Sequence, residues 1–69
     1  MSMIRVNQHL TLGIKELEDK MSVFREIQEV AMSCGDLDTV IECTEMLDKL
    51  ERNKNFFKEL LNTNTKGGE

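Results

Sequence analysis

Proline, tryptophan and tyrosine are absent from this 69-residue sequence, and its only aromatic residues are three phenylalanines. Without proline, nothing in the chain forces a break in a long helix. No run of eighteen apolar residues occurs, so we expect no segment that inserts into a membrane. Residues 1–6 contain one arginine but no long apolar run, unlike a secretory signal. We therefore predict a cytoplasmic protein.

Residues that could carry chemistry are also few. The single histidine, His9, and the two cysteines, Cys34 and Cys43, do not have the spacing of a zinc site. The carboxylates after Gly35 lack the alternating pattern of a calcium-binding loop. In a cytosolic protein both cysteines are expected to stay reduced. The alternative is an intrachain disulfide between the two helices near the turn, which their spacing allows but does not require. We predict no catalytic residues, no cofactor and no metal, and hence no enzyme.

The charge balance argues against nucleic acid as the main partner. Lysine and arginine number 9 against 13 aspartates and glutamates, a net charge of −4, whereas phosphate binding depends on a surplus of cations. The cations between Lys49 and Lys58 follow closely on Glu45, Asp48 and Glu51. This mixture is typical of a solvated helix face with internal ion pairs.

The stretch around Gly35 divides the chain into two halves. Glycine is favoured just after a helix, where the backbone turns left-handed. Asp36 can then accept hydrogen bonds from the free N–H groups of a second helix, and Asp38 adds negative charge near the same end. A helix that stops and restarts within two or three residues folds back as an αα-hairpin.

Apolar residues recur every three or four positions in both halves, the spacing of one helix face. In the first half this stripe consists of Leu10, Ile14, Leu17, Met21, Phe24, Ile27, Ala31 and Cys34. In the second half it consists of Val40, Cys43, Leu47, Leu50, Phe57 and Leu61, with Lys54 interrupting it. We predict an all-α, coiled-coil-like antiparallel two-helix hairpin, with helices near 8–34 and 37–62.

Around this hairpin we expect three segments. Residues 1–9 mix polar and apolar types and are predicted to be a flexible lead-in. Residues 10–61 form the hairpin, with the turn at 34–37. Residues 62–69 contain no apolar residue and are predicted to be a disordered tail.

Both halves carry more apolar residues than one seam between two helices needs. The surplus consists of Val23, Val30, Ile41, Met46, Phe56 and Leu60. Large apolar patches left in water mark interfaces, and a hairpin this small buries little area alone. We predict that these six residues bind a protein partner or mediate self-association, so that the hairpin is completed by a partner or by dimerisation.

A long helix, a short turn at Cys34, Gly35 and Asp36, and a second long helix resemble the small E-component co-chaperones of type III secretion needle proteins. The matching stretch is residues 14–61. The resemblance implies a non-catalytic, cytoplasmic binding module that docks on a helical-repeat chaperone and, through it, on the needle subunit. It carries over no individual contact residues.

An alternative from a different class is a homodimeric hairpin that forms a four-helix bundle and acts as a regulator. The plasmid RNA-binding protein Rop has this shape and is also small and acidic. Rop-like proteins present a basic and aromatic face to RNA, and the sequence has no clear counterpart of it. A phage-encoded inhibitor of a host protein is a further form of this alternative.

Overall fold

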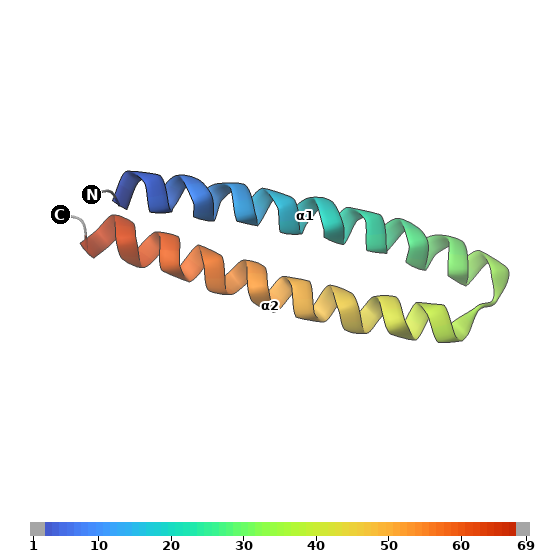
Figure 1. Ribbon diagram of the computed structural model, residues 1–69. Coiled ribbons are helices and arrows are strands. Elements are labelled where there is room, and N and C mark those ends of the chain that lie inside the picture. The colour runs from blue at the N-terminus through green and yellow to red at the C-terminus, as the bar shows by residue number, and fades with distance from the viewer. Residues whose placement is uncertain (1–2, 68–69) are drawn as a thin grey trace.

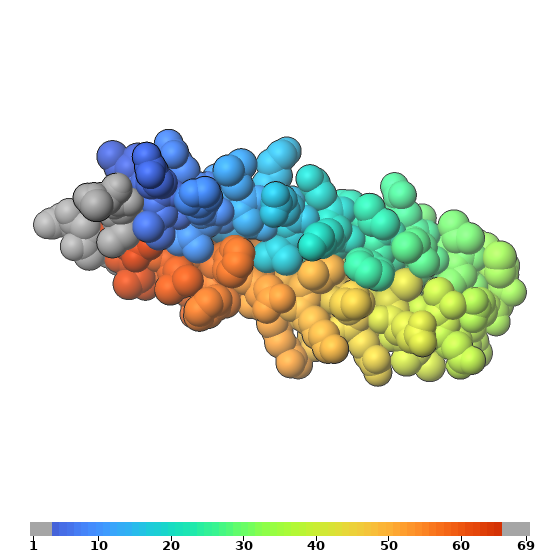
Figure 2. All heavy atoms as spheres, viewed as in Figure 1, coloured from blue at the N-terminus to red at the C-terminus, as the bar shows by residue number. Residues whose placement is uncertain are grey.

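The computed structural model describes residues 3–67, which form two helices packed side by side in opposite directions. Helix α1 spans Met3–Cys34 and helix α2 spans Leu37–Gly67. Figure 1 shows the turn at one end of the hairpin and the outer ends of both helices at the other, the open end. The Cα atoms span 52 × 14 × 12 Å, and Figure 2 shows the helices in contact along the length of the protein. The predicted all-α hairpin is confirmed.

Both helices extend beyond the predicted bounds. Residues 3–9 continue α1 and residues 62–67 continue α2, where we expected a lead-in and a tail. Residues 1–2 and 68–69 of those two segments lie outside the described residues.

Polar side chains in these added turns have hydrogen-bond partners. The Nδ2 of Asn64 donates a hydrogen bond to Oδ1 of Asn7 across the open end, at 3.2 Å. The hydroxyl of Thr65 donates to the backbone carbonyl of Leu61, four residues earlier, at 2.8 Å. Because this hydroxyl bonds back onto its own helix, threonine is accommodated without ending it.

The turn consists of Gly35 and Asp36. Gly35 has a φ of 75°, which confirms the predicted left-handed conformation. Its N–H donates to the carbonyl of Met32 at 3.1 Å, and the N–H of Asp36 donates to that of Ala31 at 2.9 Å. These two bonds satisfy carbonyls in the last turn of α1, which would otherwise lack partners.

Asp36 also caps the start of α2. Its carboxylate accepts hydrogen bonds from the hydroxyl of Thr39 at 2.6 Å and from the backbone N–H of Thr39 at 3.2 Å. The hydroxyl bond, and after it the backbone bond, lower the pKa of Asp36. The stabilisation from this cap is therefore present above the ordinary pKa of an aspartate and is lost as the pH falls through the lowered pKa.

The seam between the helices alternates steps of three and four residues without a break, as do positions a and d of a coiled coil. Every seam position is buried or half-buried. On α1 the seam consists of Asn7, Leu10, Ile14, Leu17, Met21, Phe24, Gln28 and Ala31. On α2 it consists of Val40, Cys43, Leu47, Leu50, Lys54, Phe57, Leu61 and Asn64.

Two predicted seam residues, Ile27 and Cys34, are wrong. Ile27 is 42% exposed and Cys34 is also exposed. Gln28 takes the seam position, and its Nε2 donates to the hydroxyl of Thr44 at 2.8 Å on the other helix. The reason is the seven-residue repeat, in which steps of three and four residues alternate along the seam. The step from Met21 to Phe24 is three residues, so the next seam residue lies four positions further on, at Gln28. Ile27 would require a second step of three.

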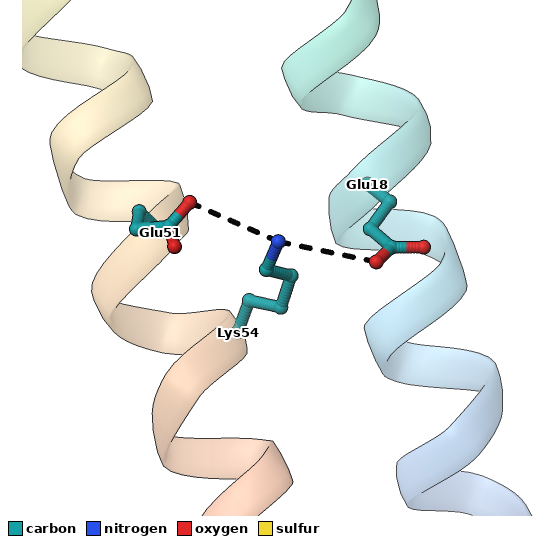
Figure 3. A network of polar contacts seen from close by, with 3 residues as sticks. All are labelled: Glu18, Glu51 and Lys54. Carbon is teal, nitrogen blue, oxygen red and sulfur yellow. Dashed lines mark ion pairs between the residues drawn. The ribbon is translucent and has the colours of Figure 1, made fainter.

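Lys54 lies in the seam with its side chain 14% exposed. Its Nζ is 3.9 Å from Oε2 of Glu18 and 3.8 Å from Oε1 of Glu51. Figure 3 shows the ammonium group between the two carboxylates. Both distances exceed hydrogen-bonding range and both carboxylates are about half exposed, so the two ion pairs are weak. A charged residue at a seam position fixes the pairing of the helices at a cost in stability.

Gly13 lets an aromatic ring approach the backbone of α1. A Cβ added at Gly13 would lie 2.7 Å from Cε2 and 3.0 Å from Cδ2 of Phe57. Such contacts are closer than van der Waals packing allows. From the sequence alone Gly13 is a weak point in a helix, but the structure gives it a packing role.

Changing Gly35 to alanine tests the turn. An added Cβ at Gly35 meets no atom within 4 Å, so only the backbone conformation is affected. Gly35→Ala should lower the free energy of unfolding by about 1–2 kcal/mol, the cost of a left-handed L-residue. Gly35→Asn should lose less, because asparagine tolerates this conformation. Thermal melting followed by circular dichroism measures both, and a wild-type melting temperature for Gly35→Ala would contradict the turn's role.

Replacing Lys54 tests the cost of the seam charge. Lys54→Leu should raise the free energy of unfolding by about 1–2 kcal/mol, because an apolar side chain replaces a weakly paired ammonium. Lys54→Ala should lower it, because the packing of the lysine stem is lost. Urea unfolding measures both. A lower midpoint for Lys54→Leu at an unchanged slope would mean that the ion pairs outweigh the desolvation of the charge.

Gly13→Ala separates helix propensity from packing. In an open helix position this change stabilises by about 1 kcal/mol. Here we expect a net loss of up to about 2 kcal/mol, since the overpacking against Phe57 outweighs that gain. In a Phe57→Leu background the same change should regain its stabilising sign, which a double-mutant cycle of urea midpoints will show. Stabilisation by Gly13→Ala alone would contradict the close packing.

Candidate protein-binding surface

The seam leaves two flanks of the hairpin open to solvent. The seven-residue repeat is counted with Asn7 of α1 and Val40 of α2 at position a. The g positions of both helices with the neighbouring c positions then lie on one side, and the e positions with the neighbouring b positions lie on the other. We call the first side the apolar flank. Its exposed large apolar residues are Val6, Val23, Ile27 and Val30 on α1, and Met46, Phe56 and Leu60 on α2.

The apolar flank contains two adjoining depressions near the turn, each with a volume of about 420 Å³. The first is lined by residues that include Val30 and Cys34, and the second by residues that include Met46. Ile27 and Thr39 line both depressions, which therefore form one groove between the helices. We call it the turn groove.

All six predicted partner-binding residues remain exposed, each by at least 37% of its accessible surface. They are Val23, Val30, Ile41, Met46, Phe56 and Leu60. This exposure leaves them available to a partner, and their role in binding stays a prediction.

Five of the six lie on the apolar flank, but only two of them line the turn groove. Val30 lines its first depression and Met46 its second. Val23 lies one helical turn before Ile27 on the same side of α1. Phe56 is ten residues beyond Met46, about 15 Å along α2, so it lies outside the groove toward the open end.

Ile41 lies on the other side of the hairpin. It occupies a b position of α2, near the e positions. The e side carries the Gln28–Thr44 hydrogen bond and the contact of Glu18 with Lys54. A ligand confined to the turn groove therefore does not contact Ile41.

Ile27 is the residue of this surface that the sequence analysis missed. It was predicted to lie in the seam, and in the structure it is the apolar residue shared by both depressions. The sequence held a usable signal: the steps from Met21 to Phe24 and from Phe24 to Ile27 are both three residues. Two short steps in a row depart from the seven-residue repeat and indicate a residue beside the seam.

A further depression lies at the open end on the side of the e positions. Its lining residues are Ile4, Asn7, Gln8, Thr11 and Leu12. All five belong to α1, so a partner there would contact one helix and would gain no second wall. The turn groove, with both helices as walls, is the better candidate for a binding site.

The side chains around the turn groove suit a ligand held by apolar and electrostatic contacts better than a covalent reaction. Cys34 is an exposed thiol and Cys43 is a buried one, and neither forms a disulfide. Among the described residues no three His, Cys, Asp or Glu side chains gather where they could hold a metal ion. The groove presents aliphatic and thioether side chains with carboxylates at its edge.

No stretch within the described part of the two helices is both long and apolar enough to cross a membrane. Comparison of the chain with protein-family models, with curated proteins and with solved structures finds no match. The exposed apolar flank is therefore the observation from which a function can be inferred.

Proposed function

We propose that this chain is a non-catalytic helical binding module that covers and stabilises a larger helical protein partner. The observation that carries the proposal is the apolar flank, which stays exposed although the seam is closed from the turn to the open end. Contiguous exposed apolar surface on a small protein is typical of an interaction site.

The small core of the hairpin supports the same proposal. Among the described residues, the side chains that are at most 9% exposed are those of Met21, Ala31, Cys43 and Leu50. A core of this size offsets little of the entropy lost when more than sixty residues become ordered. A partner that binds only the folded hairpin adds stability by mass action, and the hairpin stabilises the partner in return.

In its narrower form, the proposal is a cytoplasmic co-chaperone of a type III secretion needle subunit. In that role the hairpin binds a helical-repeat chaperone, and the resulting complex keeps the needle subunit from polymerising early. This narrower form rests on the resemblance in size, hydrophobic pattern and turn position. The alternative, a homodimeric four-helix-bundle regulator, would cover the same flank with a second copy.

Replacing apolar residues of the turn groove with charged ones tests the proposal. Val30→Glu with Met46→Glu should leave the helicity largely intact, since both positions are exposed, and should abolish partner binding. The measurement is affinity purification of the tagged protein from its native cells, with mass spectrometry of what is retained. A helical-repeat protein and a needle subunit retained by the wild type but not by the double variant would support the narrower form.

A matched control places the same charges on other exposed apolar positions. Leu12→Glu with Met32→Glu changes residues that are 57% and 65% exposed and that lie outside the turn groove. This control should retain the partner at the wild-type yield. Equal retention by the Val30 and Met46 double variant would refute the proposed surface, and retention of nucleic acid instead of protein would favour the Rop-like alternative.

A further inference from the structure

The edge of the turn groove is strongly acidic. Glu26 and Asp36 line its first depression, and Glu42 and Glu45 line its second. The only cation among the lining residues of the two depressions is Lys49. Four carboxylates against one ammonium group give the groove a negative edge.

These carboxylates are not used in ion pairs of the hairpin itself. Within the described part of the chain, the paired carboxylates are Asp48, 2.8 Å from Arg52, and the two glutamates beside Lys54. None of them lines the turn groove. Asp36 caps α2 through Thr39 and, like any aspartate with an ordinary or lowered pKa, is ionised at neutral pH. The negative charge of the groove is therefore available to a ligand.

The apolar floor of the groove has the shape of a helix-binding site. Its walls are two antiparallel helices. Ile27, Val30 and Cys34 follow one another along α1 at steps of three and four, and Thr39 and Met46 line the groove from α2. An amphipathic helix laid into such a groove contacts it with side chains at positions i, i+3 or i+4, and i+7. The residues of that helix beside its apolar stripe would face the carboxylates.

We propose that the turn groove binds an amphipathic helix of the partner whose apolar stripe is flanked by lysine and arginine, so that the three helices form a small bundle. This inference rests on the proposed function and adds the chemistry of the partner. Docked groove to groove, a second copy would set the acidic edge against itself, and juxtaposed like charges weaken association.

Two synthetic helical peptides of about sixteen residues, roughly four turns, test the inference. Both carry leucines at i, i+4 and i+7, and they differ only beside this stripe, where one has lysines and the other glutamates. Fluorescence anisotropy should show binding of the lysine peptide at least about tenfold tighter at low salt. This preference should shrink toward unity at about 1 M salt, where charges are screened beyond about 3 Å.

Removing negative charge from the edge of the turn groove, and the same charge from elsewhere on the hairpin, provides a matched comparison. Glu42→Gln with Glu45→Gln should weaken binding of the lysine peptide several-fold and should flatten its salt dependence. Glu29→Gln with Asp48→Asn removes the same charge from residues outside the groove and should change the affinity less than twofold. Equal losses in the two double variants would overturn the inference, as would equal or tighter binding of the glutamate peptide.

Sedimentation equilibrium tests the competing occupant. A wild-type dimer that Val30→Glu with Met46→Glu converts to a monomer would place a second copy in the groove and overturn the inference. The two proposals can fail separately. A native partner lost by that double variant, together with no preference for the lysine peptide, would sink this inference and leave the proposed function standing. Retention of the partner by the double variant would refute the turn groove as the binding surface, and only a wild-type protein that retains no protein partner would remove the proposed function itself.

Discussion

The structure depends on a turn of only two residues that must serve both helices. Gly35 provides the left-handed residue that ends α1, and Asp36 both closes that motif with its N–H and caps α2 with its carboxylate. Because only these two residues separate the helices, the last seam residue of α1 determines which residue of α2 is the first in the seam. The register fixed at the turn reaches the open end, where Asn7 meets Asn64.

The seam is specific rather than strongly stabilising. Polar or charged residues occupy it at Asn7, Gln28, Lys54 and Asn64, and their contacts require particular partners on the other helix. Polar groups at seam positions fix pairing at the expense of stability. The fit of Phe57 against the bare backbone of Gly13 adds a steric condition of the same kind. A hairpin built in this way has a defined shape but a small core, and stabilisation by a partner suits such a design.

The two sides of the hairpin differ in how their charged residues are arranged. Lys54, the half-buried cation of the seam, lies near Glu18 and Glu51 on the e side. The g side near the turn keeps apolar side chains and carboxylates that the hairpin does not pair. Apolar contact supplies most of the affinity of such a surface, and its charge selects among partners. The proposed binding module and its basic helical ligand both follow from this asymmetry.

The sequence by itself determined the presence of two helices, the turn and most of the seam, but not the outer ends of the helices. Periodic apolar residues, the absence of proline and the pair Gly35–Asp36 are local signals, and each acts within one helix or one turn. It also identified the surplus apolar residues as a group. Only the tertiary structure decided which of them share a surface: Ile41 lies on the opposite side of the hairpin from the other five. It also placed Ile27, which was predicted in the seam, in the turn groove. The physical reason is that a side chain's partner depends on the register between two helices, so a change of one residue moves it by about 100° around its helix.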